Sequence, residues 1–121
     1  MKRLNVLFLD IEGGHGGSSR SLFSFLKYID REKINPIVIC KKDGLIEQYE
    51  KLKIQCYVEK NMPTFTVLKK QNRNFLYYLF FKLYFWPKSK KFRKKVLKII
   101  INKDIDLVHC NLISLFLFAK W

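Results

Sequence analysis

Four glycines within five positions, between Gly13 and Gly17, form the part of the sequence best suited to bind a ligand. Glycine lets the backbone adopt positive φ angles and come close to a bound group. The apolar residues from Leu22 to Ile29 then have helical spacing, with Ser18 or Ser19 as the predicted N-cap. Free N–H groups and the positive dipole end at a helix start favour phosphate. We therefore predict a phosphate-binding loop, with a flexible turn as the alternative.

Three familiar phosphate-binding motifs do not fit this loop. A dinucleotide fingerprint has a third glycine where Ser19 stands, and an acidic residue at the end of the second strand, where Cys40-Lys41-Lys42 stands. A Walker loop requires Gly-Lys followed by Ser or Thr, which the sequence lacks. A phosphoryl-receiver domain requires an aspartate after the third strand, where the sequence reads Val58-Glu59-Lys60. The motif alone therefore leaves the phosphate ligand open.

Strands and helices alternate along the chain. Strands are predicted at Leu4–Leu9, Ile37–Cys40, Ile54–Val58 and Asp106–Cys110. Beyond the helix after the glycines, helices are predicted at Leu45–Leu52, about Val67–Trp86, Lys90–Asn102 and from Leu112 onward, with Pro87 separating the second and third of these. This order predicts an α/β, Rossmann-like, doubly wound parallel sheet. Because such sheets usually have roughly five or more strands, residues 1–121 are expected to form one incomplete domain.

Composition narrows the class of protein. The 121 residues suffice for one domain, and 49% of them are hydrophobic, enough for a packed core. The three cysteines are far apart in sequence and form no CxxC pair, so neither a disulfide framework nor a zinc site is predicted. A buried strand explains the apolar start better than a signal peptide, because acidic residues stop the run and no cleavage site follows. No uncharged apolar stretch reaches the roughly 18 residues of a membrane span. A cytoplasmic location is predicted.

Three segments in order resemble the family 4 glycosyltransferases, which have the GT-B fold. Gly16–Leu22 resembles the GGxxR-x-L loop of that family. The turn at Gly44-Leu45 with the later Leu52-Lys53-Ile54 is similar to its second crossover, although Lys53 replaces the usual glycine. Ile105–Asn111 resembles its fourth strand, which ends near a histidine. The resemblance spans nearly the whole chain and implies an acceptor-side, N-terminal domain without its donor-binding C-terminal partner.

The resemblance also implies roles for single residues. The glycine pair would donate backbone N–H groups to the donor diphosphate, whose negative charge grows as it leaves. His109 would hydrogen-bond the transferred sugar, although a histidine at a strand end often only satisfies a nearby backbone group. Arg20 would add charge beside the phosphate or simply lie at the surface. The implied sites are Gly16, Gly17 and Ser18 for the donor phosphate, His109 as the catalytic residue, and His15, Arg20 and Asn111 in the acceptor cleft. Two histidines are too few to suggest a metal, and the nucleotide-sugar is a co-substrate rather than a cofactor.

A basic and aromatic segment precedes the last predicted strand. No acidic residue occurs between Lys60 and Lys103, and the formal net charge is +14. An aromatic run from Phe75 to Trp86 is followed at once by basic residues. Aromatic residues beside lysines suit the headgroups of an anionic membrane. The predicted membrane patch consists of Trp86, Lys88, Lys90, Lys91, Arg93, Lys94 and Lys95. Nucleic acid and a merely solvated basic face are the alternatives, and the consecutive rather than interleaved aromatics count against nucleic acid.

These patterns lead to two functional hypotheses. The first is the N-terminal part of a retaining glycosyltransferase that moves a sugar from a nucleotide-sugar to a lipid-linked or polysaccharide acceptor, at the inner face of the cell membrane. Because the chain provides no identifiable residues for the base, ribose or donor sugar, it is expected to be inactive alone. The second is a non-catalytic, truncated Rossmann-like module that binds a membrane or a partner chain.

Overall fold

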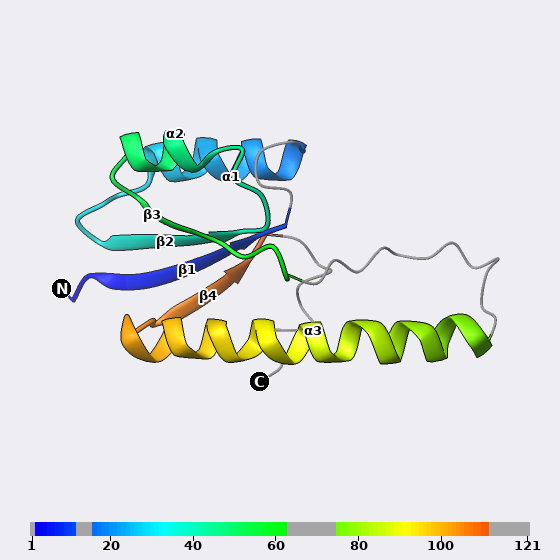
Figure 1. The fold of residues 1–121 in the computed structure, drawn as a ribbon. Coiled ribbons are helices and arrows are strands. Elements are labelled where there is room, and N and C mark those ends of the chain that lie inside the picture. Colours follow the sequence, from blue (N-terminus) through cyan, green and yellow to red (C-terminus); the bar gives the residue numbers. More distant parts are fainter. Residues whose placement is uncertain (1, 12–15, 63–74, 112–121) are drawn as a thin grey trace.

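The computed structural model describes residues 2–11, 16–62 and 75–111 (Figure 1). In chain order the elements are β1 (Leu4–Asp10), α1 (Gly17–Tyr28), β2 (Ile34–Cys40), α2 (Ile46–Lys51), β3 (Gln55–Val58), α3 (Phe75–Asn102) and β4 (Leu107–Cys110). The four strands are parallel and lie in the order β3-β2-β1-β4. The predicted α/β class with a parallel sheet is confirmed, and the arrangement is consistent with a Rossmann-like fold.

Helices cover both faces of the sheet, with α1 and α2 on one face and α3 on the other (Figure 1). Right-handed crossovers explain this arrangement, because the chain moves from β1 to β3 in one direction and then returns past β1 to β4. The central strand β1 serves two cores. Val6 and Phe8 pack toward α1, whereas Leu7 and Leu9 pack with Phe92 of α3. A strand that is buried on both faces reads as a continuous apolar run, which is why it was recognisable in the sequence.

Helix α3 is much longer than the sheet that it covers. Its 28 residues span about 42 Å, whereas the seven residues of β1 span about 23 Å. The buried residues Phe92 and Val96 lie in its second half, and the first half extends past the carboxyl edge of the sheet (Figure 1). Leu79 and Leu83 in this first half are exposed. Both lie on one side of α3, and the aromatic side chains of this first half are outside the described part.

Two prolines are placed differently from the prediction. Pro87 lies inside α3 and does not separate two helices, so that prediction is wrong. Pro87 and Leu83, four residues earlier, are both exposed, so the hydrogen bond that proline removes is lost on a face open to water. Pro36 was predicted to precede a strand but lies within β2, opposite Val6. Pairing between β2 and β3 begins only at Ile37, which leaves Pro36 at an edge position where its missing N–H is tolerated.

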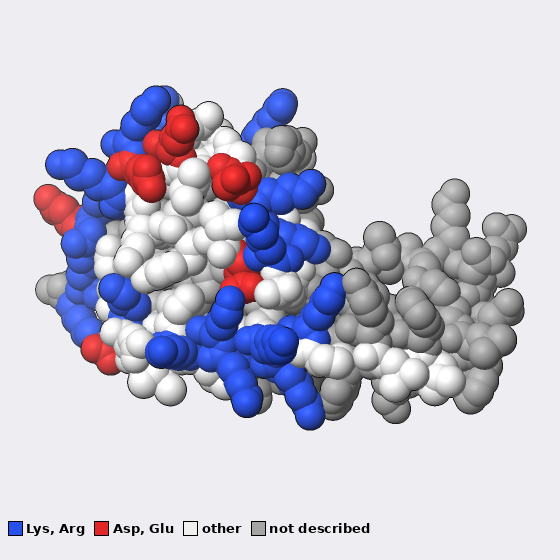
Figure 2. All heavy atoms as spheres, in the orientation of Figure 1, with Lys and Arg blue, Asp and Glu red and all other residues white. Residues whose placement is uncertain are grey.

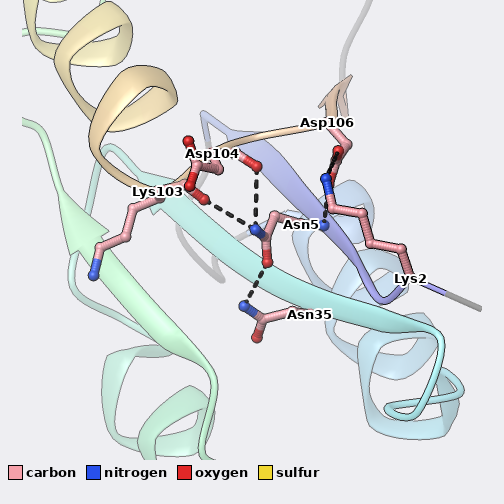
Figure 3. Close-up of polar contacts among 6 residues, drawn as sticks. All are labelled: Lys2, Asn5, Asn35, Lys103, Asp104 and Asp106. Atoms are coloured by element: carbon pink, nitrogen blue, oxygen red, sulfur yellow. Dashed lines mark hydrogen bonds and ion pairs between the residues drawn. The ribbon is translucent and has the colours of Figure 1, made fainter.

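The amino edge of the sheet is held by hydrogen bonds around Asn5 (Figure 3). Its side-chain amide donates to the carbonyls of Lys103 and Asp104, at 3.0 and 3.1 Å. Its side-chain oxygen accepts from Asn35 at 2.9 Å, and its backbone N–H donates to Asp106 at 2.8 Å. The bond from the Asn5 N–H, followed by that from Lys2, lowers the pKa of Asp106. Asn5 therefore ties the end of α3 and the start of β4 to the central strands.

Two cysteines that are distant in sequence meet in the sheet. The Sγ atoms of Cys40 on β2 and Cys56 on β3 lie 3.4 Å apart, as a pair of thiols rather than a disulfide. This hydrogen bond lowers the pKa of Cys40 and raises that of Cys56. Spacing along the sequence did not indicate this contact, because it depends on the pairing of β2 with β3.

Replacing Tyr49 with phenylalanine is expected to raise the free energy of unfolding. Tyr49 is fully buried, and its hydroxyl has no hydrogen-bond partner among the residues that the structure describes. Burial raises the pKa of this phenol. Removing the hydroxyl removes a desolvation cost of about 1 kcal/mol or more and keeps the ring against Phe23, whose centroid is 5.5 Å away. Urea unfolding followed by circular dichroism measures the change, with the exposed Tyr28→Phe as the control. A loss of stability in Tyr49→Phe would mean that the hydroxyl has a partner.

Candidate functional site

Asp10 lies at the centre of the carboxyl edge of the sheet, where β1 and β4 end and α1 begins. It is fully buried, and its Oδ1 accepts hydrogen bonds from Ser19 Oγ at 2.8 Å and from Asn111 Nδ2 at 3.3 Å. The Asn111 side chain also donates to the Ser18 carbonyl at 3.1 Å, and its backbone N–H donates to the Leu9 carbonyl at 3.0 Å. These bonds connect the end of β1, the first turn of α1 and the end of β4.

Sequence reasoning missed the role of Asp10. The available signal was an acidic residue that ends a run of buried strand residues and stands three positions before the first glycine, Gly13. Its Oδ2 atom is buried and has no hydrogen-bond partner among the described residues. A buried carboxyl oxygen without a partner is unusual in a folded protein and is frequently found where function depends on it.

The glycine loop meets α1 differently from the prediction. Gly16 is the N-cap, with extended backbone and no side-chain cap, so the prediction of Ser18 or Ser19 as N-cap is wrong. Ser19 belongs to the first turn, and its hydroxyl donates a hydrogen bond to the carboxyl group of Asp10 instead of capping the helix. Arg20 is exposed, and its N–H makes the first helical bond, to the Gly16 carbonyl at 3.2 Å. His15 lies outside the described residues.

The start of α1 is open at Gly17. Apart from its chain neighbours and the backbone of the helix itself, no atom of the described residues lies within 4 Å of a Cβ atom built on Gly17. Gly17 is exposed and Ser18 is half-buried. A ligand can therefore approach the backbone of the first turn, where N–H groups precede the first helical hydrogen bond.

His109 and Asn111 line a pocket beside α1. The pocket has a volume of about 330 Å³, and its other lining residues are mostly apolar, with Phe8, Phe25 and Leu107 among them. His109 is exposed on β4, and its ring packs against Phe8 with the centroids 5.2 Å apart and the planes tilted by 48°. The pocket thus combines an imidazole with an apolar wall along α1, from Ser21 to Ile29. Asn111, predicted as an acceptor contact, already uses its amide nitrogen to hold the site together.

The basic residues of the predicted membrane patch lie along α3 (Figure 2). Lys90, Lys91 and Lys94 are exposed, whereas Lys88 and Arg93 are half-buried. Lys95 is exposed but forms an ion pair with Glu59. Burial would raise the pKa of Glu59, but the bonds from Lys95 and from the Asn61 N–H outweigh it and lower the pKa. The side chain of Trp86 is outside the described part.

Residues 2–11, 16–62 and 75–111 contain neither a membrane-spanning helix nor a metal-binding cluster. No helix in these ranges is both long enough and apolar enough to cross a membrane. No group of three or more histidine, cysteine, aspartate or glutamate side chains there has the arrangement of a metal site.

Comparison with known proteins adds no relative. Protein-family models, curated proteins and solved structures give no match to the chain. The resemblance to family 4 glycosyltransferases therefore remains a prediction from three motifs. The geometry of the carboxyl edge is what a functional proposal has to explain.

Proposed function

We propose that this chain is the acceptor-side domain of a GT-B glycosyltransferase, which transfers a sugar from a nucleotide-sugar to a lipid-linked or polysaccharide acceptor. The observation that carries this proposal is the open helix start at Gly17, which lies at the same edge of the sheet as His109, near the end of β4. A donor diphosphate would contact the backbone of Gly16, Gly17 and Ser18. The departing diphosphate gains negative charge, and fixed N–H groups at a helix start stabilise that charge.

The Asp10 network supports the proposal because it fixes the geometry of the site. Ser19 and Ser18 belong to the turn that would hold the diphosphate, and Asn111 follows the strand that carries His109. The hydrogen bonds therefore hold the phosphate-binding turn at a set position relative to the imidazole. Such positioning is a main source of catalysis when two substrates have to be aligned. His109 would hydrogen-bond a sugar hydroxyl, and the apolar wall would contact the less polar part of a substrate.

A non-catalytic module that binds an anionic membrane is the second candidate. It is favoured by one stripe along α3, on which exposed apolar and basic side chains alternate in groups. The stripe consists of Leu79, Leu83, Lys90, Lys94, Leu97 and Ile101, all exposed. Successive members are three, four or seven residues apart, which places them on one side of the helix. This side is opposite to Phe92 and Val96, which pack on the sheet.

Titration of the chain with uridine and guanosine diphosphates tests the first proposal. In a two-dimensional NMR experiment on ¹⁵N-labelled protein, the amide signals of Gly16, Gly17 and Ser18 are expected to shift. Binding is expected to be weak, with a dissociation constant of roughly 1 mM, because helix-terminus contacts to a phosphate contribute only about 1 kcal/mol each. Unmodified uridine is the control and is expected to leave these signals unchanged. Unchanged signals with both diphosphates would overturn the assignment of the loop.

A further inference from the structure

A separate, basic pocket lies at the carboxyl edge of the sheet, beyond the ends of β2 and β3. It is lined by Lys41, Lys42, Asp43 and Lys60 and has a volume of about 320 Å³. It shares no lining residue with the His109 pocket. A volume of this size holds a phosphate or a diphosphate group.

Backbone hydrogen bonds fix the position of this pocket. Cys40 of β2 is in register with both Asp10 of β1 and Val58 of β3, so these strands end at one level. Just beyond them, the Lys41 N–H donates to the Asp10 carbonyl at 3.2 Å, and the Glu59 N–H donates to the Cys40 carbonyl at 2.8 Å. The lysines therefore follow strand ends that are hydrogen-bonded to their neighbours. Lys41 lies directly beside the end of β1, which carries the buried Asp10.

The pocket is strongly electropositive. Among the described residues, its lining holds three lysines and a single carboxylate, that of Asp43. The nearby Glu59 does not balance this excess, because it forms an ion pair with Lys95. Partial burial, then the charges of Lys88 and Lys42, lower the pKa of Lys41. Figure 2 shows that basic side chains predominate from this edge toward α3, where Lys88 lies. A bound anion would relieve the mutual repulsion of these ammonium groups.

We propose that this lysine pocket binds a phosphate group of the acceptor. The assignment to the acceptor rests on the proposed function, in which the start of α1 already holds the donor diphosphate. The binding of phosphate itself rests only on the pocket. An acceptor that carries phosphate can be a membrane lipid or a phosphate ester in solution, and both present the same dianionic group to the three lysines.

The experiment uses inorganic pyrophosphate as the probe and the complete 121-residue chain. Amide signals of Lys41, Lys42, Asp43 and Lys60 are expected to shift on titration. Lys41→Gln/Lys42→Gln/Lys60→Gln is expected to weaken binding at these signals about tenfold or more, because it removes charge-assisted hydrogen bonds. The matched control is Lys27→Gln/Lys51→Gln/Lys103→Gln. It removes the same charge from exposed residues at the ends of α1, α2 and α3, which lie at the opposite edge of the sheet. Equal weakening of pyrophosphate binding in both triple variants would overturn the proposal that phosphate binds in this pocket.

Two further arms separate the possible outcomes. Gly17→Val is expected to leave the lysine-pocket shifts unchanged, so a failure of the donor loop does not affect this test. If the shifts occur only at Gly16 and Gly17, the proposal of phosphate binding in the lysine pocket is wrong, whereas the assignment of the donor diphosphate to the start of α1 is supported. If the half-buried Lys41 is needed for folding, the Lys42→Gln/Lys60→Gln variant gives the same test.

Vesicle flotation identifies the source of the phosphate. Phosphatidylcholine vesicles with phosphatidic acid are compared with glycerol 3-phosphate in solution. Loss of vesicle binding in the pocket variant but not in the control indicates a lipid phosphate. Loss of glycerol 3-phosphate binding with unchanged vesicle binding indicates a phosphate ester in solution. A pocket variant that still binds both ligands as the control does would overturn the proposal.

Discussion

Gly17→Val is expected to abolish sugar transfer in a chain completed by a donor-binding domain, while the fold of the present domain stays intact. The side chain would occupy the open space before the first turn of α1, where the diphosphate is proposed to bind. Apart from the chain neighbours and the helix backbone, no atom of the described residues lies within 4 Å of the added Cβ, so the substitution creates no steric clash with those residues at that atom. Loss of even two backbone contacts to a developing charge corresponds to a rate decrease of about 10⁴-fold or more.

Product formation and circular dichroism together test this prediction. Gly17→Ala serves as the graded control, because its single methyl group blocks less of the space and is expected to lower the rate without abolishing transfer. A valine variant with the wild-type rate and an unchanged spectrum would show that the diphosphate does not bind at this turn. A valine variant that loses its helical spectrum would instead contradict the expectation that the fold is retained.

Strands and helices that show in the pattern of apolar residues along the chain could be predicted from the sequence. The central strand is an apolar run because both of its faces are covered, and the helices between the strands have the spacing of one buried face. Pro87 misled the prediction because the effect of a proline depends on which side of the helix loses its hydrogen bond, and that side was not known. The N-cap prediction failed because an N-cap hydroxyl accepts a hydrogen bond from a backbone N–H, whereas the Ser19 hydroxyl donates to the carboxyl group of Asp10.

The candidate site depends on contacts that the sequence does not display. Asn111 is 101 residues from Asp10, and their contact follows from β4 lying beside β1. The lysine pocket likewise requires the ends of β2 and β3 to be neighbours, which brings Lys60 to Lys41. Residue types did indicate the glycine turn and His109 as candidates. What they could not indicate was that the carboxyl group of Asp10 is hydrogen-bonded to both Ser19 and Asn111.

Asp10→Ala is expected to lower the free energy of unfolding by about 2–3 kcal/mol. Ser19 Oγ would lose its acceptor in a buried environment, and Asn111 would lose one of the two acceptors of its side-chain amide. Each buried donor that is left without a partner costs roughly 1–3 kcal/mol. Removal of the partnerless Oδ2 offsets part of this cost, which is why the expected value is not larger.

The Asp10→Ala substitution is also expected to loosen the backbone at the start of α1. Without the Asp10 hydrogen bonds the first turn of α1 is no longer joined through a side chain to the end of β1, although Asn111 still contacts the Ser18 carbonyl. The amides of Gly16, Gly17 and Ser18 should therefore exchange faster with solvent, while those of β2 keep their protection. Urea unfolding and hydrogen exchange measure the two effects. Asp10→Asn is the matched control, because it keeps the shape and one carbonyl acceptor and should lose less stability. If Asp10→Ala were as stable as the wild type, the burial of the partnerless oxygen would outweigh both hydrogen bonds, and Asp10 would not be what holds the site together.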